Sequence, residues 1–452
     1  MTNALVVTTQ RYLSFAHGED DADKVYKVFG NSLILHFAIA LGVLLILLIV
    51  DYPIVYKILH IPTDRLFAAS VVFLVASLML FMAIITAPIR ALFFARENIV
   101  YISVVDVLDG ALKLLFAVWL AHVSGDRLIV YAFMLLGIQI LNFLLLSVYA
   151  GIKYEECHLP RLREFDKQWV KDLSYFAGWS VYASGCVVVR NQSIAVLLNL
   201  FLSTVANAAY GIAQQVSGAV TFVSASIINA VNPQLMKAEG AGNRERMVHL
   251  AEQESKFSFI VLALFSVPIM FEMPSILSVW LTEVPPFTVN MCRLLILAVL
   301  CDQLTIGLTS ANQAVGQIKT YTLCFYSIKI LTVLGVWLCL FLEYSVNYAF
   351  LVYVLIEFAD SFVRLPLLKK QIGLDILRFC KNAILPAVIP LIVIILTSYF
   401  CVVFVQIKYR FLLTIVLSVL IGGVAIYIFG LNKREKQYIG NLVLTIRSRV
   451  SS

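Results

Sequence analysis

Long apolar segments alternate with short polar ones along almost the whole chain. The apolar segments lie at about 31–50, 67–93, 100–121, 128–152, 174–198, 206–234, 257–282, 289–311, 320–341, 346–367, 383–405 and 410–430. A helix of about 20 apolar residues is long enough to cross the hydrocarbon core of a bilayer. The pattern therefore predicts an all-α polytopic membrane protein with about 12 transmembrane helices.

Composition supports this class and excludes several others. Of the 452 residues, 61% are hydrophobic and 13% are charged, which is too little charge to cover a soluble domain. No P-loop, GxGxxG or HExxH motif is present, so the sequence encodes no ATP-driven motor. The cysteines form no CxxC pair and the histidines do not cluster, so we expect neither a metal site nor a cofactor. We expect most aromatic side chains to face lipid or the membrane interface.

Lysine and arginine are distributed unevenly between the two sides of the predicted membrane. If residues 1–30 are cytoplasmic, the cytoplasmic connections hold 24 of these residues, the exterior connections hold 5, and the other 5 lie inside spans. Cytoplasmic loops of membrane proteins are enriched in Lys and Arg. We therefore predict that both ends of the chain are cytoplasmic. The net charge of +7 follows from these loops and does not indicate nucleic-acid binding.

The connections between spans predict the domain organisation. The longest exterior connection is about 51–66, which leaves no room for a soluble catalytic region, so we do not expect an enzyme. The largest cytoplasmic connection, 153–173, reads as a linker lying along the membrane. The predicted domains are an N-terminal lobe of four spans at 1–152, that linker, a C-terminal lobe of six spans at 174–369, two trailing helices within 370–430, and a basic cytoplasmic tail at 431–452.

Weak internal similarity indicates a duplication. At an offset of 224 residues Gly18 aligns with Gly242, and at 221 Pro53 aligns with Pro274. The tripeptide VWL recurs at an offset of 218, so the offset drifts smoothly, as it does in a diverged repeat. The second copy has about 54 residues before "IINAVNPQ", but the first has three before the matching segment. We infer that the first helix and most of the second are missing here, through a late gene start or a shortened product.

The residues near the start of the second half resemble a known family. "SYFAGWSVYASGCVVVRNQSIAVLLNLF", "INAVNPQLMKAEGAGNRERM" and, near the start of the chain, "TTQRYLSFAHGEDDADKVYKVFGNSLILH" are similar to segments of Wzx-type polysaccharide-biosynthesis flippases. These belong to the MOP superfamily of exporters, whose best-known fold is that of the MATE transporters. The resemblance implies a MATE-like fold of two pseudo-symmetric helical lobes followed by two trailing helices.

The resemblance also implies a function, a location and partners. Such proteins flip a prenyl-diphosphate-linked oligosaccharide from the cytoplasmic to the outer leaflet of the bacterial inner membrane, by alternating access, for O-antigen, capsule or exopolysaccharide assembly. Partners would be the lipid-linked oligosaccharide, membrane lipids, H+ or Na+ as coupling ion, and polymerase and chain-length proteins. Two alternatives are a MATE-type cation or drug antiporter and a scaffold of a polysaccharide synthase complex that does not transport.

Polar groups inside the predicted spans are the candidates for substrate binding. A lone Arg190 near a helix centre costs about 2.5 kcal/mol or more, and its guanidinium suits diphosphate oxygens. It either faces such a substrate or pairs with an acid on a neighbouring helix. Lys329 is the second diphosphate candidate, or it pairs with Asp302. Four amides can hydrogen-bond sugar hydroxyls or tie helices together, namely Asn191, Gln214, Gln215 and Asn229.

Two predicted spans carry the same pattern of charges. Two acids three residues apart are followed, four residues later, by a base, as in Asp106, Asp109 and Lys113, and in Glu357, Asp360 and Arg364. We expect acid and base on one helix to neutralise each other. Each set leaves one acid over, and a spare buried carboxylate can couple proton or sodium movement to transport. The ion-coupling candidates are Asp106, Asp109, Glu357, Asp360 and Asp302.

Overall fold

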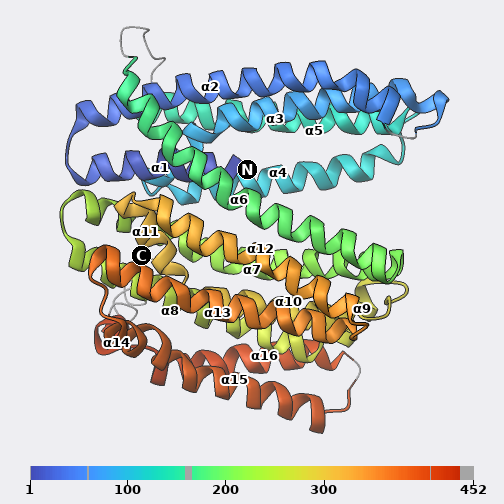
Figure 1. The fold of residues 1–452 in the computed structure, drawn as a ribbon, viewed down its shortest axis with the longest axis vertical. Helices are drawn as coiled ribbons and strands as arrows, with labels where there is room; N and C mark the ends of the chain where they lie inside the picture. The colour runs from blue at the N-terminus through green and yellow to red at the C-terminus, as the bar shows by residue number, and fades with distance from the viewer. Residues whose placement is uncertain (1, 59–60, 158–164, 408, 438–452) are drawn as a thin grey trace, which may run out of the picture. The chain divides into compact units, whose positions relative to one another are not determined.

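The computed structural model describes residues 2–58, 61–157, 165–407 and 409–437 (Figure 1). All regular secondary structure in these residues is helical, and no β-strand occurs among them, which confirms the predicted all-α class. Parts of the predicted linker and most of the predicted tail lie outside the described residues, as does Lys408.

The predicted spans coincide with helices. Within the described residues nine helices are long and apolar enough to cross a membrane, or ten if the bent pair α10 and α11 forms one span. Helices α4 (Ile99–Leu120) and α13 (Val346–Ile372) are long but are not among them, and each carries three charged residues near its middle. The two helices that hold the repeated charge pattern are thus the predicted spans whose composition fits a membrane-crossing helix least well.

The chain folds into two compact units. Unit 1 contains Met1–Ser184 and Met236–Arg244, and unit 2 contains Gly185–Leu235 and Glu245–Ser452. Two long helices, α6 (Lys167–Phe201) and α7 (Thr204–Gly240), contribute residues to both units.

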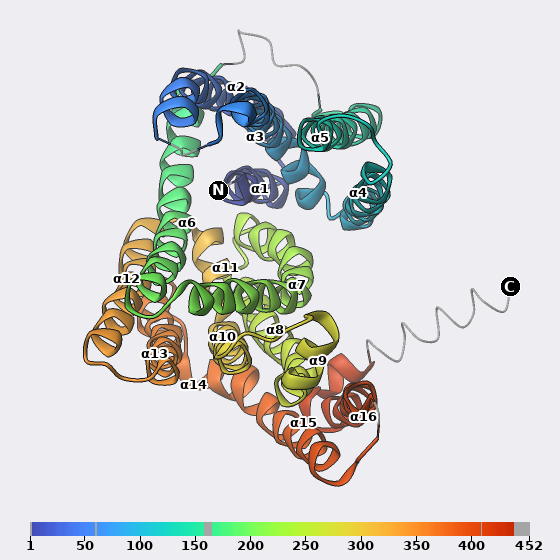
Figure 2. The same cartoon turned by 90° about the vertical axis from the view of Figure 1, so that its right-hand side faces the viewer.

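Unit 1 is built around α3 (Leu66–Ala95). This helix packs against α1 (Thr2–Gly18), α2 (Ala22–Pro53) and α5 (Arg127–Lys153), while α4 packs against α5. Figure 1 shows α2, α3 and α5 running side by side, and Figure 2 shows the same helices nearly end-on. Between α2 and α3 lie η1 (Ile54–Ile58) and the short turn η2 (Thr63–Arg65).

Local sequence signals start the helices of unit 1. The Asp21 carboxylate accepts a hydrogen bond of 3.0 Å from the backbone N–H of Lys24 and caps α2. Asp126 caps α5 in the same way, accepting from the N–H of Leu128 at 3.0 Å. Each cap satisfies an N–H that the helix itself cannot pair. The core beneath is closely packed, and Phe29 and Phe93 are fully buried in it.

Two glycines allow the ends of α1 and α7 to touch within unit 1. A Cβ atom at Gly18 would lie 2.2 Å from the Lys237 carbonyl oxygen, and one at Gly240 would lie 2.2 Å from the Phe15 oxygen. Only a residue without a side chain fits at either position. Residues 18 and 240 are 222 positions apart, and so are residues 15 and 237, so one offset relates both halves of the contact. This value lies between the offsets of 224 and 221 found in the sequence.

Unit 2 contains the remaining helices. They are α8 (Arg244–Phe271), α9 (Met273–Trp280), α10 (Thr288–Gln303), α11 (Ile306–Val315), α12 (Ile318–Phe341), α13, α14 (Ile376–Phe379), η4 (Cys380–Ile384), α15 (Leu385–Phe404), α16 (Arg410–Ala425) and η5 (Ile426–Gly430). α13 packs against α10 and α12, and α15 packs against α16.

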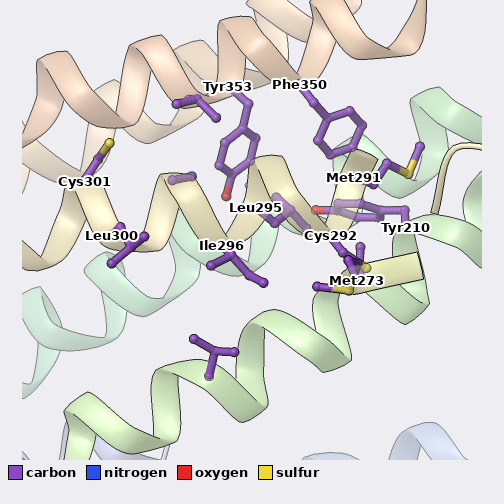
Figure 3. Packing of buried hydrophobic residues seen from close by; sticks show 14 of the residues in the cluster. Tyr210, Met273, Met291, Cys292, Leu295, Ile296, Leu300, Cys301, Phe350 and Tyr353 are labelled. Carbon is purple, nitrogen blue, oxygen red and sulfur yellow. The ribbon is translucent and has the colours of Figure 1, made fainter. Parts of the chain in front are cut away.

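The core of unit 2 lies where α7, α10 and α13 meet. Tyr210 of α7 and Phe350 of α13 lie with their ring centroids 5.7 Å apart, and Met291 and Ile296 of α10 pack in the same cluster (Figure 3). Tyr353 stands one turn beyond Phe350 on α13. This apolar cluster fixes the three helices that carry most of the polar groups described below.

A break between α10 and α11 exposes backbone polar groups inside unit 2. The two helices are bent by 47°. Side chains of α13 satisfy the freed carbonyls at the end of α10: Ser361 Oγ donates to the Cys301 carbonyl at 2.8 Å, and Arg364 Nη1 donates to the Asp302 carbonyl at 2.8 Å. A broken helix is tolerated at membrane depth where other protein groups pair the backbone in this way.

Candidate functional site

A cavity of about 320 Å³ lies in unit 2 among α6, α7, α10, α12 and α13. Its volume is at the lower end of the range for small-ligand sites, roughly 300–1,000 Å³. Charged side chains from four helices line it, namely Arg190, Asp302, Lys329, Glu357 and Arg364. The structure thus brings five charged residues from separate parts of the sequence to one cavity.

Glu357 of α13 holds two cations at once. One of its carboxylate oxygens, Oε1, accepts a hydrogen bond from the Arg190 guanidinium of α6. The other, Oε2, accepts from Lys329 Nζ of α12 at 2.7 Å. Glu357 is 4% exposed, so both contacts are shielded from water. The two cations therefore converge on a single oxyanion group.

Asp302 and Arg364 form the second part of the cluster. Arg364 Nη2 donates to Asp302 Oδ1 at 2.6 Å, and Nη1 donates to the Asp302 carbonyl at 2.8 Å and to Thr305 Oγ1 at 3.1 Å. Lys329 Nζ connects the two parts, since it lies 3.7 Å from Asp302 Oδ1 and 3.4 Å from Asp360 Oδ2. The predicted alternative pairing of Lys329 with Asp302 is present, but Glu357 is the nearer partner.

The cluster balances its charges. It contains three bases, Arg190, Lys329 and Arg364, and three acids, Asp302, Glu357 and Asp360. Burying an ion is costly unless an opposite charge and hydrogen bonds offset the lost hydration. The equal numbers explain how so many ions coexist inside one helical unit.

Aromatic rings support the three cations. The Arg190 guanidinium carbon lies 4.9 Å from the centroid of the Tyr353 ring, and Phe325 lies under both Lys329 Nζ, at 4.7 Å, and the Arg364 guanidinium carbon, at 4.2 Å. Such contacts add stabilisation where water is excluded. These two rings are buried, so they are exceptions to the expectation that most aromatic side chains face lipid or the membrane interface. The sequence held a signal for their contact with the charged cluster, since each ring stands four residues before a charged residue, Lys329 or Glu357.

The four candidate amides are placed differently from one another. Gln214 lines the cavity and donates to the Tyr210 hydroxyl, and Asn191 Oδ1 accepts from Arg190 Nε at 3.1 Å. Gln215 is exposed on α7, and Asn229 lies further along that helix and is not part of the cavity wall. Only Gln214 is therefore in position to meet a molecule in this cavity.

The charge set on α13 pairs with other helices and not with itself. Arg364 binds Asp302 of α10, while Glu357 binds cations of α6 and α12. The expected neutralisation within α13 is absent because the break after α10 brings the Asp302 carbonyl and carboxylate to Arg364 together.

The matching set on α4 lies in unit 1. Asp109 binds Lys113 at 2.6 Å, as the spacing of four predicts, and also accepts from Asn142 Nδ2 of α5 at 2.7 Å. Asp106 pairs with Arg90 of α3. Their side chains are much more exposed than those of unit 2, at 51% for Asp106 and 47% for Lys113. None of the described cavities in unit 1 includes these residues.

Known proteins resemble this chain in fold. No protein-family model and no curated protein sequence matches it. Among solved structures, a MATE transporter in complex with MaL6 is 13% identical, covers 82% of this chain and 84% of its own, and has a TM-score of 0.74. An outward-facing multidrug-resistance MATE transporter and a MOP-superfamily transporter from Pyrococcus furiosus are each 14% identical, with the same coverage and a TM-score of 0.74. The chain therefore has the MATE fold, and it is a multi-pass helical membrane protein.

Proposed function

We propose that this protein flips a prenyl-diphosphate-linked oligosaccharide between the leaflets of a membrane by alternating access. One observation carries the proposal: Arg190 and Lys329 come from two helices and converge on one oxyanion group in a cavity. An arginine fork and an ammonium placed in this way suit the oxygens of a phosphate group. Gln214, in the same cavity, offers an amide for sugar hydroxyls.

Physical considerations favour an anionic cargo. A diphosphate crossing the bilayer must exchange its hydration shell for cationic partners, because an unpaired charge in hydrocarbon is very costly. The solved structure from Pyrococcus furiosus is one whose reversed binding-pocket polarity suggests a different function for that protein. A fold that accommodates pockets of different polarity is consistent with cations in the present cavity.

A cation antiporter is the second candidate, and one observation favours it. Asp302, Glu357 and Asp360 place three carboxylates in or beside the cavity, and neighbours of the same fold include a multidrug-resistance transporter. However, the aromatic rings and carboxylates that would attract a cationic drug are already in contact with the protein's own bases. The anionic cargo is preferred because Arg190 and Lys329, from two helices, converge on one oxyanion group in the cavity.

A transport assay distinguishes the two. The full chain would be reconstituted into vesicles that contain a fluorescent prenyl-diphosphate oligosaccharide, and its movement between leaflets would be followed beside that of a cationic dye. We expect the lipid-linked sugar to move and the dye to stay. Movement of the dye alone would support the antiporter, and movement of neither would support a scaffold without transport.

A balanced double variant tests the site itself. Arg190→Gln with Glu357→Gln removes one base and one acid, so the cluster keeps equal numbers of each, and Lys329 keeps Asp302 and Asp360 as partners. We expect it to lose most translocation. The matched control is Lys256→Gln with Glu435→Gln, because this pair is also buried in unit 2, at 2.6 Å, but does not line the cavity. Equal transport by the two double variants would contradict the assigned site.

A further inference from the structure

Glu357 already holds the two cations that would bind a diphosphate under the proposed function. Its two oxygens accept hydrogen bonds from Arg190 Nη1 and Lys329 Nζ, and all three residues line the cavity. A diphosphate held by the same two cations would bring further negative oxygens against this carboxylate. The substrate and the ionised Glu357 therefore compete for one pair of cations.

Arg364, the third cation of the described cluster, already holds Asp302 through two of its nitrogens, Nη1 and Nη2, and is therefore a poor partner for a displaced carboxylate. The groups that interact with Glu357 come from the helices around it: Arg190 of α6, Cys301 of α10, Lys329 of α12, and Tyr353 and Asp360 of α13. Asp360 is an acid, and Asp302 is a second one that shares Lys329 with Glu357, so both repel a further negative charge.

An ionised carboxylate left without a cation in this position would be very unfavourable. Breaking a buried pair by removing its partner leaves an uncompensated charge, and such a group takes up a proton to become neutral. A protonated Glu357 no longer repels phosphate oxygens, and it can donate a hydrogen bond to one of them.

We propose that the Glu357 carboxylate holds Arg190 and Lys329 while the cavity is empty, and that a bound diphosphate displaces it. Binding of each diphosphate is thereby coupled to the uptake of one proton by Glu357. This inference rests on the proposed function. The step is a proton transfer alone: a proton from solvent adds to a Glu357 oxygen, and the diphosphate takes over the contacts to Arg190 and Lys329. When the diphosphate leaves, the proton returns to solvent and both contacts form again.

The exchange makes substrate affinity depend on pH in a defined direction. Where Glu357 is ionised in the empty cavity, each unit of rising pH should weaken diphosphate binding by about tenfold, because one proton must be taken up. The probe is a short-chain prenyl-diphosphate sugar, which is a diester. Its phosphates do not titrate near neutral pH, unlike a phosphate monoester, whose second pKa is about 6.

Calorimetry on the detergent-solubilised full chain tests the proposal. Binding would be measured between pH 5.5 and 8.5 in buffers of different ionisation enthalpy, which reports the number of protons taken up. For the unaltered protein we expect one proton per diphosphate. For Glu357→Gln we expect no uptake, no pH dependence, and binding that is at least about tenfold tighter at pH 8 because the competitor is gone.

Glu254→Gln is the matched control. Glu254 is a fully buried carboxyl of α8 in unit 2 that accepts a hydrogen bond of 2.6 Å from Ser310 and lies outside the cavity wall. This variant should keep the proton uptake. A merely structural role for Glu357 predicts weaker binding in Glu357→Gln, and persistent uptake in that variant would assign the proton to another group. Either result overturns the inference.

The outcomes separate this inference from the proposed function. If the unaltered protein binds the diphosphate without taking up a proton, the proposed proton uptake by Glu357 is wrong, but the proposed diphosphate-binding site is kept. If the unaltered protein binds no diphosphate at any pH, the proposed function is wrong and the exchange falls with it.

Discussion

Helices α4 and α13 carry the same order of charges, two acids and then a base at spacings of three and four, but the two units use it differently. On α4, in unit 1, Lys113 binds Asp109 one turn away and Asp106 pairs with Arg90 of α3, while Asp106 and Lys113 remain exposed. On α13, in unit 2, the corresponding side chains are buried and bind partners on other helices, so that Arg364 is 1% exposed.

The neighbouring helices explain the contrast. Only Ile102 and Val105 of α4 are buried, so most of this helix has no protein against it within the described structure. α13 packs against α10 and α12, which supply Asp302 and Lys329. The comparison teaches that charge spacing identifies candidate residues, while the burial of their helix decides whether they form a local pair or a network.

Removing one base should have the largest effect and should differ most between the units. We expect Arg190→Ala to destabilise the protein by about 3–5 kcal/mol, because it leaves Glu357 with one cation fewer in a buried site. Arg90→Ala, which removes the partner of the exposed Asp106, should cost less than about 1 kcal/mol. Thermal unfolding in detergent measures both, and equal losses would show that the two sets are not different in kind.

The glycine contact of unit 1 should give the next largest effect. Gly18→Ala would place a Cβ atom 2.2 Å from a backbone oxygen of Lys237, so the helices must move apart, at a cost of about 1–3 kcal/mol. Gly42→Ala in α2 is the control, since nothing lies within 4 Å of its added Cβ. It should be neutral or slightly stabilising. The same unfolding measurement applies, and a harmless Gly18→Ala would show that the ends of α1 and α7 do not touch.

A smaller effect, confined to acidic pH, is expected at the end of α1 in unit 1. Burial lowers the pKa of His17 to about 4, with the positive charge of Arg96 acting in the same direction. Between about pH 6.5 and 4 the unfolded chain therefore binds a proton that the folded His17 does not, so stability falls as the pH falls. His17→Gln should flatten this fall. Unfolding midpoints measured from pH 7 to 4 give the slope, and an unchanged slope would contradict the assignment.

Glu156 beside His17 changes stability in the same direction. Burial raises the pKa of the Glu156 carboxyl, but hydrogen bonds of 2.6 and 2.7 Å from Arg96 and its positive charge outweigh burial, so the pKa lies below its usual value. Glu156 therefore contributes its full stabilisation of the folded state above the ordinary Glu pKa. This stabilisation is lost as the pH falls through the lowered pKa. Arg96→Met should remove the depression, and it should make His17 easier to protonate.

The smallest effect belongs to the local pair on α4. Lys113→Gln should cost about 0.3–0.5 kcal/mol, the usual worth of an exposed pair at this spacing. Its partner keeps a hydrogen bond from Asn142, so no buried charge is left alone. A loss as large as that of Arg190→Ala would place α4 in contact with a buried polar site.

The sequence predicted most of the helices and part of the site. Runs of apolar residues located the helices because burial in lipid depends on local composition alone. Arg190 and Lys329 stood out because a charge is costly inside an apolar run. The alternative that Arg190 pairs with an acid on another helix agrees with the observed Glu357 contact.

The identity of the shared partner depended on tertiary structure. Glu357 holds both cations because α6, α12 and α13 meet, and no spacing along the chain reports that meeting. The break after α10 turns Asp302 toward Arg364, which replaced the pair expected within α13. Phe325 and Tyr353 are exceptions to the expectation that most aromatic side chains face lipid, and the charged residue four positions after each was a sequence signal for their burial.

Photochemical labelling tests the central claim most directly, because it asks which unit's charges meet the diphosphate. A photoreactive side chain would be placed at Val187, which lines the cavity one turn before Arg190, and in a second protein at Val107, an exposed residue of α4. Each protein would be irradiated with a radiolabelled prenyl-diphosphate sugar. We predict labelling from position 187 that excess unlabelled lipid abolishes and a cationic dye does not. Equal labelling from position 107, or none from 187, would contradict the anion site in unit 2.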